Sequence, residues 1–129
     1  MALALDLSSV KSEPKPEKRS ELALEYANTA LDQAKAAYQE GRWEQTQEAL
    51  KELDQAVALS YESLTSTGKN ARKNSTPFKK AEKATRELLR RLSGFRDFMS
   101  AVDHPAVDPV VANVNQVHDK LLTDIMTGK

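Results

Sequence analysis

The sequence of 129 residues contains no cysteine, which excludes disulfide bonds and thiol chemistry. It has only four glycines, and its 40% hydrophobic and 29% charged residues favour a helical soluble protein over a disordered chain. Lys plus Arg equals Asp plus Glu at 19 each, so the net charge indicates neither a nucleic-acid partner nor an acidic one. No apolar run approaches the ~20 residues that cross a bilayer. The length fits one domain with a single modest core.

Catalytic and metal-binding patterns are also missing. Residues 66–70, STGKN, contain Gly-Lys but lack the glycine five positions before Gly68 that a phosphate-binding loop needs. His104 and His118 are the only histidines and lack the HExxH and ExxH spacings, so no metal site is predicted. We expect His104 in a loop and His118 at an outer face or core edge. Three tyrosines either line a ligand cleft or, as we favour, act as spacers of a helical core: Tyr26, Tyr38 and Tyr61.

Residues 1–17 are predicted to be a mobile tail. Their first part, MALALDLSSV, lacks the basic start and long apolar centre of a signal peptide. The next part is charged and carries Pro14 and Pro16, which favour extended backbone. Two origins stay open for this end of the chain: an exported protein whose signal was replaced by a new Met, or an ordinary cytoplasmic amino terminus.

Residues 18–129 are predicted to form a single all-α domain. Four segments repeat apolar residues at intervals of three and four, the period of an amphipathic helix: 18–40, 42–66, 77–102 and 107–127. Their connections are short, which favours an up-down antiparallel four-helix bundle. A three-helix core with a looser fourth helix is the alternative. The apolar stripes include Leu31, Trp43, Leu53, Leu88, Leu92, Val102 and Val114, and Leu53, Leu88 and Leu92 are predicted to lie at central positions.

Glycine and proline predict where the helices end. Gly41 is placed to leave the first helix in a left-handed conformation. Ser75 or Thr76 is expected to cap the third helix. Residues 103–108 are expected to break the chain, since Pro105 and Pro109 cannot both lie inside an unkinked helix, and Asp108 would cap the fourth helix. Gly94 lies inside the third helix, where a close helix crossing would explain it.

One corner of the sequence, AYQEGRWEQTQEAL at residues 37–50, resembles the turn of a tetratricopeptide repeat, in which a glycine stands between two aromatic residues. That resemblance implies a repeat scaffold that grips partners. The corner departs from the family at Thr46, where a small alanine is usual, and no second copy follows 34 residues later. An ordinary helical hairpin is therefore the favoured interpretation. The whole chain also resembles uncharacterised helical-bundle proteins exported by soil bacteria, without a specific motif.

Charge is unevenly distributed along the chain. Residues 69–91 hold nine basic and two acidic residues, a net charge of +7, whereas residues 40–62 hold six acidic and two basic, a net charge of −4. Four basic residues of the third helix recur at intervals of four, three and four and form one basic stripe: Lys79, Lys83, Arg86 and Arg90. In the favoured interpretation they flank the seam with an antiparallel second helix. In the alternative they bind phosphates.

These patterns together predict a helical interaction or structural protein rather than an enzyme, with no cofactor. Its expected partner is another protein, and an oligomer is compatible with the apolar stripes. The alternative is a module that binds an anion or nucleic acid through the basic stripe. No aromatic platform interleaves with the stripe, which disfavours single-stranded nucleic acid as the partner.

Overall fold

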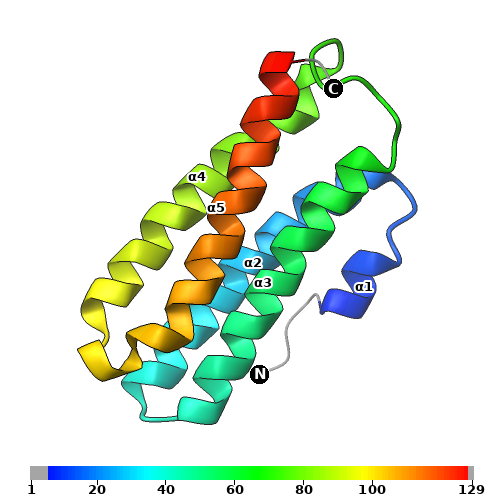
Figure 1. The fold of residues 1–129 in the computed structure, drawn as a ribbon. Coiled ribbons are helices and arrows are strands. Elements are labelled where there is room, and N and C mark those ends of the chain that lie inside the picture. Colours follow the sequence, from blue (N-terminus) through cyan, green and yellow to red (C-terminus); the bar gives the residue numbers. More distant parts are fainter. Residues whose placement is uncertain (1–5, 128–129) are drawn as a thin grey trace.

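The computed structural model describes residues 6–127, and within them every regular element is a helix. Four long helices form an elongated bundle, with a short helix beside it (Figure 1). The predicted all-α antiparallel four-helix bundle is therefore confirmed. The elements are α1 Leu7–Lys11, α2 Pro16–Gln39, α3 Trp43–Thr65, α4 Ser75–Phe98, the 3₁₀-helix η1 Ala101–Asp103, and α5 His104–Thr127.

The bundle consists of two antiparallel hairpins, α2–α3 and α4–α5, which pack on each other through α3 against α5 and α2 against α4. The prediction that α3 and α4 are close antiparallel neighbours is wrong, because their mutual contact is the sparsest among the packed pairs of long helices. Residues 66–74 carry the chain diagonally across one end of the bundle (Figure 1). As a result, helices that run in the same direction lie side by side, α3 beside α5 and α2 beside α4 (Figure 1).

The α2–α3 seam is built from small residues. Alanine side chains let two helix axes approach closely, which explains why this hairpin has the most extensive contact in the bundle. Two buried hydroxyls on α3 bond to backbone carbonyls of their own helix region, Thr46 to Arg42 at 2.8 Å and Ser60 to Val57 at 2.7 Å. The buried alanines of these two helices are Ala23, Ala27, Ala30, Ala34, Ala37, Ala49 and Ala56.

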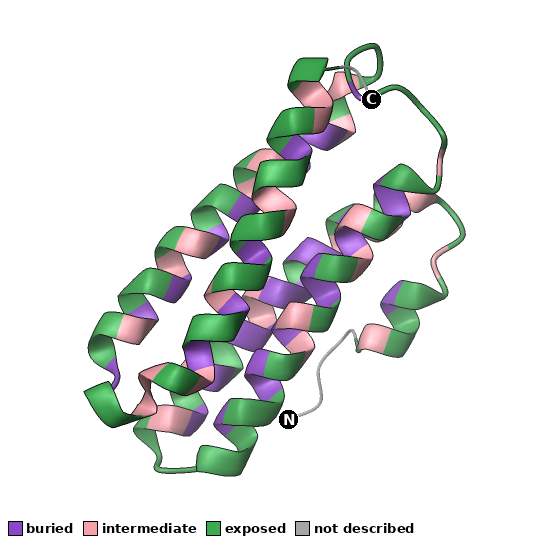
Figure 2. Ribbon diagram, viewed as in Figure 1, coloured by how far each residue is buried: buried purple, intermediate pink, exposed green. Residues whose placement is uncertain are grey.

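The α4–α5 hairpin contributes larger side chains to the same core. Buried residues follow the inner faces of all four long helices, while the outer faces are exposed (Figure 2). The predicted core leucines Leu53, Leu88 and Leu92 are confirmed as buried. The largest buried residues of α4 and α5 are Phe78, Leu88, Leu92, Phe95, Val107, Val114 and Leu121.

Part of the predicted mobile tail is ordered against the bundle. Residues 1–5 lie outside the described residues, but residues 7–11 form α1, so the prediction is wrong there. Asp6 caps this helix by accepting a hydrogen bond from the Ser9 N–H at 2.8 Å. Val10 is fully buried and joins the core, which gives a five-residue helix the tertiary support that it needs.

The two predicted helix ends around glycine and proline have different outcomes. Gly41 adopts φ +75°, and the Arg42 N–H donates to the Ala37 carbonyl at 2.8 Å, so the left-handed turn is confirmed. The predicted break at residues 103–108 is wrong, because α5 begins at His104 and continues through Pro109. Pro105 lies in the first turn, where the N–H has no helical partner, and Pro109 removes only the bond to the carbonyl of Pro105.

Three finer predictions about α4 are also wrong. It begins at Ser75, with Asn74 preceding it as an N-cap without a side-chain bond. It ends at Phe98, so Val102 falls in η1 and is exposed rather than part of the core. A side chain at Gly94 would meet no atom within 4 Å, so no close helix crossing explains this glycine.

Candidate functional site

Aromatic rings gather at one end of the bundle, where α2 passes into α3 and α4 passes into α5. The Tyr38 ring makes edge-to-face contacts with Trp43, Phe95 and Phe98, with centroids 6.2, 5.8 and 6.1 Å apart. These four residues are more than half of the chain's seven aromatic residues. We call this region, residues 38–48 and 95–108, the aromatic end.

Tyr38 is held in place by its hydroxyl as well as its ring. The hydroxyl donates to Asp103 Oδ2 at 2.8 Å and accepts from the Ser100 N–H at 2.9 Å. Both partners lie between α4 and α5, so the two bonds tie the end of α2 to the other hairpin. This residue therefore fixes the position of the rings around it.

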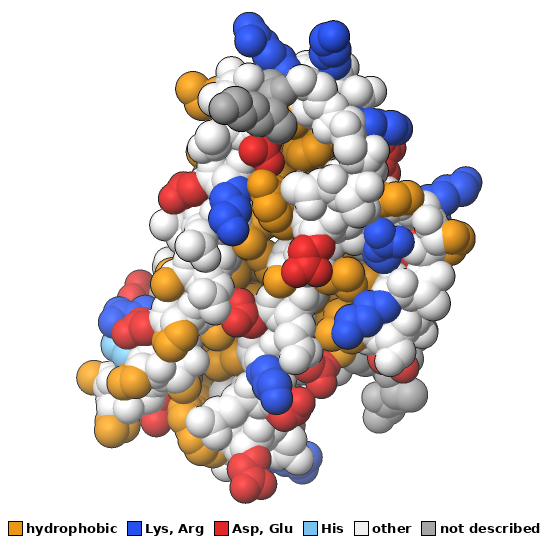
Figure 3. Space-filling model, turned by 45° about the vertical axis from the view of Figure 1, so that its right-hand side comes forward, with side chains coloured by type: hydrophobic (Ala, Val, Ile, Leu, Met, Phe, Trp, Pro, Cys, Tyr) orange, Lys and Arg blue, Asp and Glu red, His pale blue; other side chains and the backbone are white. Residues whose placement is uncertain are grey.

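Three large apolar side chains remain exposed around Tyr38. Trp43 is 36% exposed, Phe98 is 60% exposed and Val102 is 83% exposed. The prediction that Trp43 and Val102 face the core is therefore wrong. In the space-filling view, hydrophobic side chains gather at the lower left of the molecule (Figure 3). Two hollows of about 240 Å³ flank them, one lined by Lys35, Gln39, Gly94, Phe95 and Phe98, the other by Tyr38, Gly41, Trp43 and Asp103.

The four residues of the predicted basic stripe are all exposed on α4. Arg86 bonds to Glu82 of its own helix, with Nε 3.0 Å from Oε2. Among the described residues, no acidic side chain of α3 forms an ion pair with α4; the ion pairs that α4 makes with other helices go to α2 and α5. The expected pairing with α3 is therefore wrong, because α3 lies diagonally opposite.

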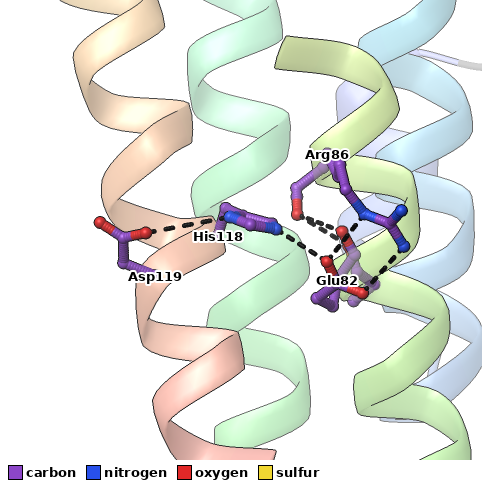
Figure 4. Close-up of polar contacts among 6 residues, drawn as sticks. Glu82, Arg86, His118 and Asp119 are labelled. Atoms are coloured by element: carbon purple, nitrogen blue, oxygen red, sulfur yellow. Dashed lines mark hydrogen bonds and ion pairs between the residues drawn. The ribbon is translucent and has the colours of Figure 1, made fainter. Parts of the chain in front are cut away.

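A polar cluster joins α4 to α5 (Figure 4). His118 Nε2 lies 2.8 Å from Glu82 Oε2, the oxygen that also accepts from Arg86. On the other side of the ring, Nδ1 is 3.9 Å from Asp119. Burial raises the pKa of Glu82, but the hydrogen bonds from His118 and Arg86 outweigh it and hold the pKa below its usual value. The cluster therefore keeps a carboxylate ionised at a helix interface.

Two further tyrosines also donate their hydroxyls to carboxylates. Tyr26 bonds to Glu52 across α2–α3, and Tyr61 bonds to Asp124 across α3–α5 at 2.6 Å. Burial, together with the neighbouring carboxylate, raises the pKa of each phenol to about 12, so each keeps its proton. Because the three tyrosines lie in different interfaces, they do not form one ligand cleft, and their bonds join helices.

A groove of about 510 Å³ runs between α3 and α5 beside Tyr61. Asn113 bridges it by donating to Asp54 at 2.8 Å, and the Lys120 ammonium lies 5.7 Å from the centre of the Tyr61 ring.

The described residues contain no group of three or more His, Cys, Asp or Glu placed to hold a metal ion. His104, expected in a loop, is instead the first residue of α5, and its ring nitrogen contacts the Met99 carbonyl at 3.2 Å.

Sequence reasoning missed the aromatic end. The signal was available, since Trp43 directly follows the turn and Phe98 lies three residues after Phe95, just before the chain breaks. Aromatic residues next to helix ends have fewer core neighbours than those in the middle of a helix. The concentration of aromatic residues at these helix ends distinguishes this end of the bundle from the rest of the surface.

No family model, curated protein or solved structure matches the chain. Within residues 6–127, no helix combines the length and the hydropathy needed to cross a membrane.

Proposed function

We propose that this chain is a non-enzymatic interaction protein that contacts a partner protein through its aromatic end. The supporting observation is the exposure of Trp43 and Phe98 around a fixed Tyr38. Large apolar side chains that are exposed together mark contact surfaces more often than single ones do. Trp and Tyr are also the residues that most often dominate binding energy at interfaces.

The rigidity of the aromatic end strengthens this proposal. Binding loses free energy whenever a flexible side chain or loop must be ordered. Here the Tyr38 hydroxyl is already engaged by Ser100 and Asp103, and its ring already contacts the two exposed rings. Little ordering is therefore left for the partner to induce.

The test is capture of binding partners by the tagged chain from an extract of its source cells. We expect the Trp43→Glu/Phe98→Glu variant to lose the captured protein. The control variant Gln55→Glu/Gln116→Glu adds the same charge at exposed positions on the side of the bundle and should keep it. Circular dichroism checks that both variants keep wild-type helix content. Equal capture by both variants, or no capture by the wild type, would count against the proposal.

A second candidate function is anion binding by the basic stripe. The observation that favours it is the exposure of all four cations, together with the lack of ion pairs to α3 among the described residues. Phosphate contacts by such residues weaken steeply as salt rises. The test replaces Lys79, Lys83, Arg86 and Arg90 by Gln and measures heparin and DNA binding against salt concentration. A steep salt dependence that the variant loses would support this function; equal, weak binding by both proteins would reject it.

A further inference from the structure

The large apolar side chains that are exposed in residues 6–127 all lie near the two ends of the bundle. Three belong to the aromatic end, as described above. The other two, Leu122 and Met126, are 36% and 73% exposed and lie in the last two turns of α5. These turns lie beside residues 66–74 and the start of α4, at the opposite end of the molecule (Figure 1). We call residues 66–80 and 120–127 the basic end.

The two ends carry opposite charge. The aromatic end has six acidic residues (Glu40, Glu44, Glu48, Asp97, Asp103 and Asp108) and two basic ones (Arg42 and Arg96), a net charge of −4. The basic end has six basic residues (Lys69, Arg72, Lys73, Lys79, Lys80 and Lys120) and one acidic residue (Asp124), a net charge of +5. Residues 13–19, at the start of α2, add three basic and two acidic residues and leave the sign unchanged. Lys and Arg side chains project from the upper end of the molecule (Figure 3).

Part of this charge is free to act on another molecule. At the aromatic end, Glu40 and Asp108 are engaged by Arg42 and Arg96, but Glu44 and Asp97 form no ion pair with a described residue. At the basic end, Lys69 and Lys80 pair with Glu17 and Glu21 of α2. Arg72, Lys73 and Lys79 are exposed and have no ion pair among the described residues.

We infer that the aromatic end of one copy of this chain docks on the basic end of a second copy, head to tail. This inference rests on the proposed function, since it names the partner of the aromatic end. Contact between two aromatic ends would oppose −4 with −4, and contact between two basic ends would oppose +5 with +5. Like charges brought together at an interface disfavour it strongly, so only the head-to-tail arrangement is complementary.

The apolar side chains suit the same arrangement. Trp43 and Phe98 are rigid rings, whereas Met126 is flexible and adapts to the shape of its neighbours. A head-to-tail contact leaves one free end on each side, so it repeats and gives a linear chain or a closed ring. Because opposite charges contribute to the contact, added salt should shorten these assemblies.

The test uses two variants, each blocked at one end. Trp43→Lys/Phe98→Lys removes both rings and adds positive charge to the acidic aromatic end, which blocks it, and Arg72→Glu/Lys73→Glu/Met126→Glu blocks the basic end. Each variant alone should stay monomeric, but their mixture should form a dimer of about twice the monomer mass, because one intact end of each kind remains. Sedimentation equilibrium measures this. The wild type should grow beyond the dimer as concentration rises, as should the control Gln55→Lys/Gln116→Lys, which adds the same charge on the side of the bundle.

Three outcomes would overturn the inference. The first is a wild type that stays monomeric up to ~1 mM, where even weak interfaces assemble. The second is a blocked variant that still dimerises alone, which indicates a two-fold interface. The third is a mixture that stays monomeric although both variants keep wild-type helix content. The milder variants Phe98→Ser and Met126→Ser should weaken wild-type assembly in the same way if either blocked variant unfolds. A monomeric wild type whose capture of a different protein still depends on Trp43 and Phe98 would keep the proposed function and reject only this partner.

Discussion

The middle of the bundle and its two ends are built differently. In the middle, Leu53 and Leu92 are fully buried, and every buried side-chain nitrogen or oxygen of the described residues has a hydrogen-bond partner. At the ends, Phe98 and Met126 are mostly exposed, and several charges have no ion-pair partner among the described residues. The middle is thus complete within one chain, whereas the ends retain apolar surface and charge that a second molecule can cover.

Because of this difference, stability and binding should depend on different residues. Burial of apolar surface is the main favourable contribution to folding, and most of it occurs in the middle. Substitutions there should change the free energy of unfolding and leave the binding surface intact. Substitutions at the ends should do the reverse.

The largest expected effect comes from a cavity in the middle. Leu92→Ala should lower the free energy of unfolding by ~2 to 5 kcal/mol, because it removes buried carbon atoms and leaves a space that the core fills only partly. Urea unfolding followed by circular dichroism measures it. Lys51→Ala, on the exposed face of α3, is the control and should stay within ~0.5 kcal/mol. Equal losses at Lys51 and Leu92 would show that the assigned core is wrong.

A smaller effect is expected from overpacking the alanine seam. Ala27 is fully buried on the inner face of α2, whose most extensive contact is with α3, so Ala27→Leu should destabilise the fold by ~1 to 3 kcal/mol, because the added carbon atoms force the packed helices apart. Ala36 is exposed on the same helix, and Ala36→Leu should have almost no effect. If the buried substitution were tolerated as well as the exposed one, the close approach of α2 and α3 would be refuted.

The polar cluster in the α4–α5 interface should give a smaller, pH-dependent effect. The pKa of Glu82 is lowered on folding, so the ionised Glu82 carboxylate stabilises the folded protein. This stabilisation is present above about pH 4.3, the usual glutamate pKa, and is lost as the pH falls through the pKa of Glu82 in the folded state. Glu82→Gln should therefore be less stable than the wild type near neutral pH, and the difference should shrink in acid. Chemical unfolding at several pH values measures it, with the exposed Glu87→Gln as control. A difference that does not change with pH would contradict this role.

The smallest stability effect is expected at the aromatic end. Phe98→Ser removes a mostly exposed ring and one edge-to-face contact, worth about 0.5 to 1.5 kcal/mol in buried pairs, so the loss should lie at or below the lower value. Thermal or urea unfolding measures it, while self-association should fall clearly. A loss as large as that of Leu92→Ala would place Phe98 in the core and remove the distinction between middle and ends.

The sequence allowed the middle to be predicted well, because helical periodicity depends on which side chains face inward. The repeat of apolar residues at intervals of three and four correctly placed Leu53, Leu88 and Leu92 in the core. Periodicity does not say which helix an apolar face meets, so the diagonal placement of α3 and α4 was missed. The position of Pro109 also misled, since a proline near a helix start removes only one backbone bond.

The ends were harder to predict for a different reason. Helix α1 has five residues, too few to show a period, and the burial of Val10 depends on the packing of α1 against α2 and α3, which the sequence does not show. Trp43 fits the spacing of the core stripe of α3, but it is the first residue of the helix and is 36% exposed. The basic stripe was located correctly on one face of α4, whereas its supposed partner depended on the wrong neighbour.

Trp43 allows the most direct test of the claim that the ends make contact between molecules. It is the chain's only tryptophan and lies at the aromatic end, so its fluorescence quenching by acrylamide reports whether that end is covered. We expect quenching to decrease as wild-type protein is concentrated, and to stay constant in Arg72→Glu/Lys73→Glu/Met126→Glu, whose changes lie at the opposite end of the same molecule. Quenching that stays constant in the wild type, or decreases equally in both proteins, would contradict the account.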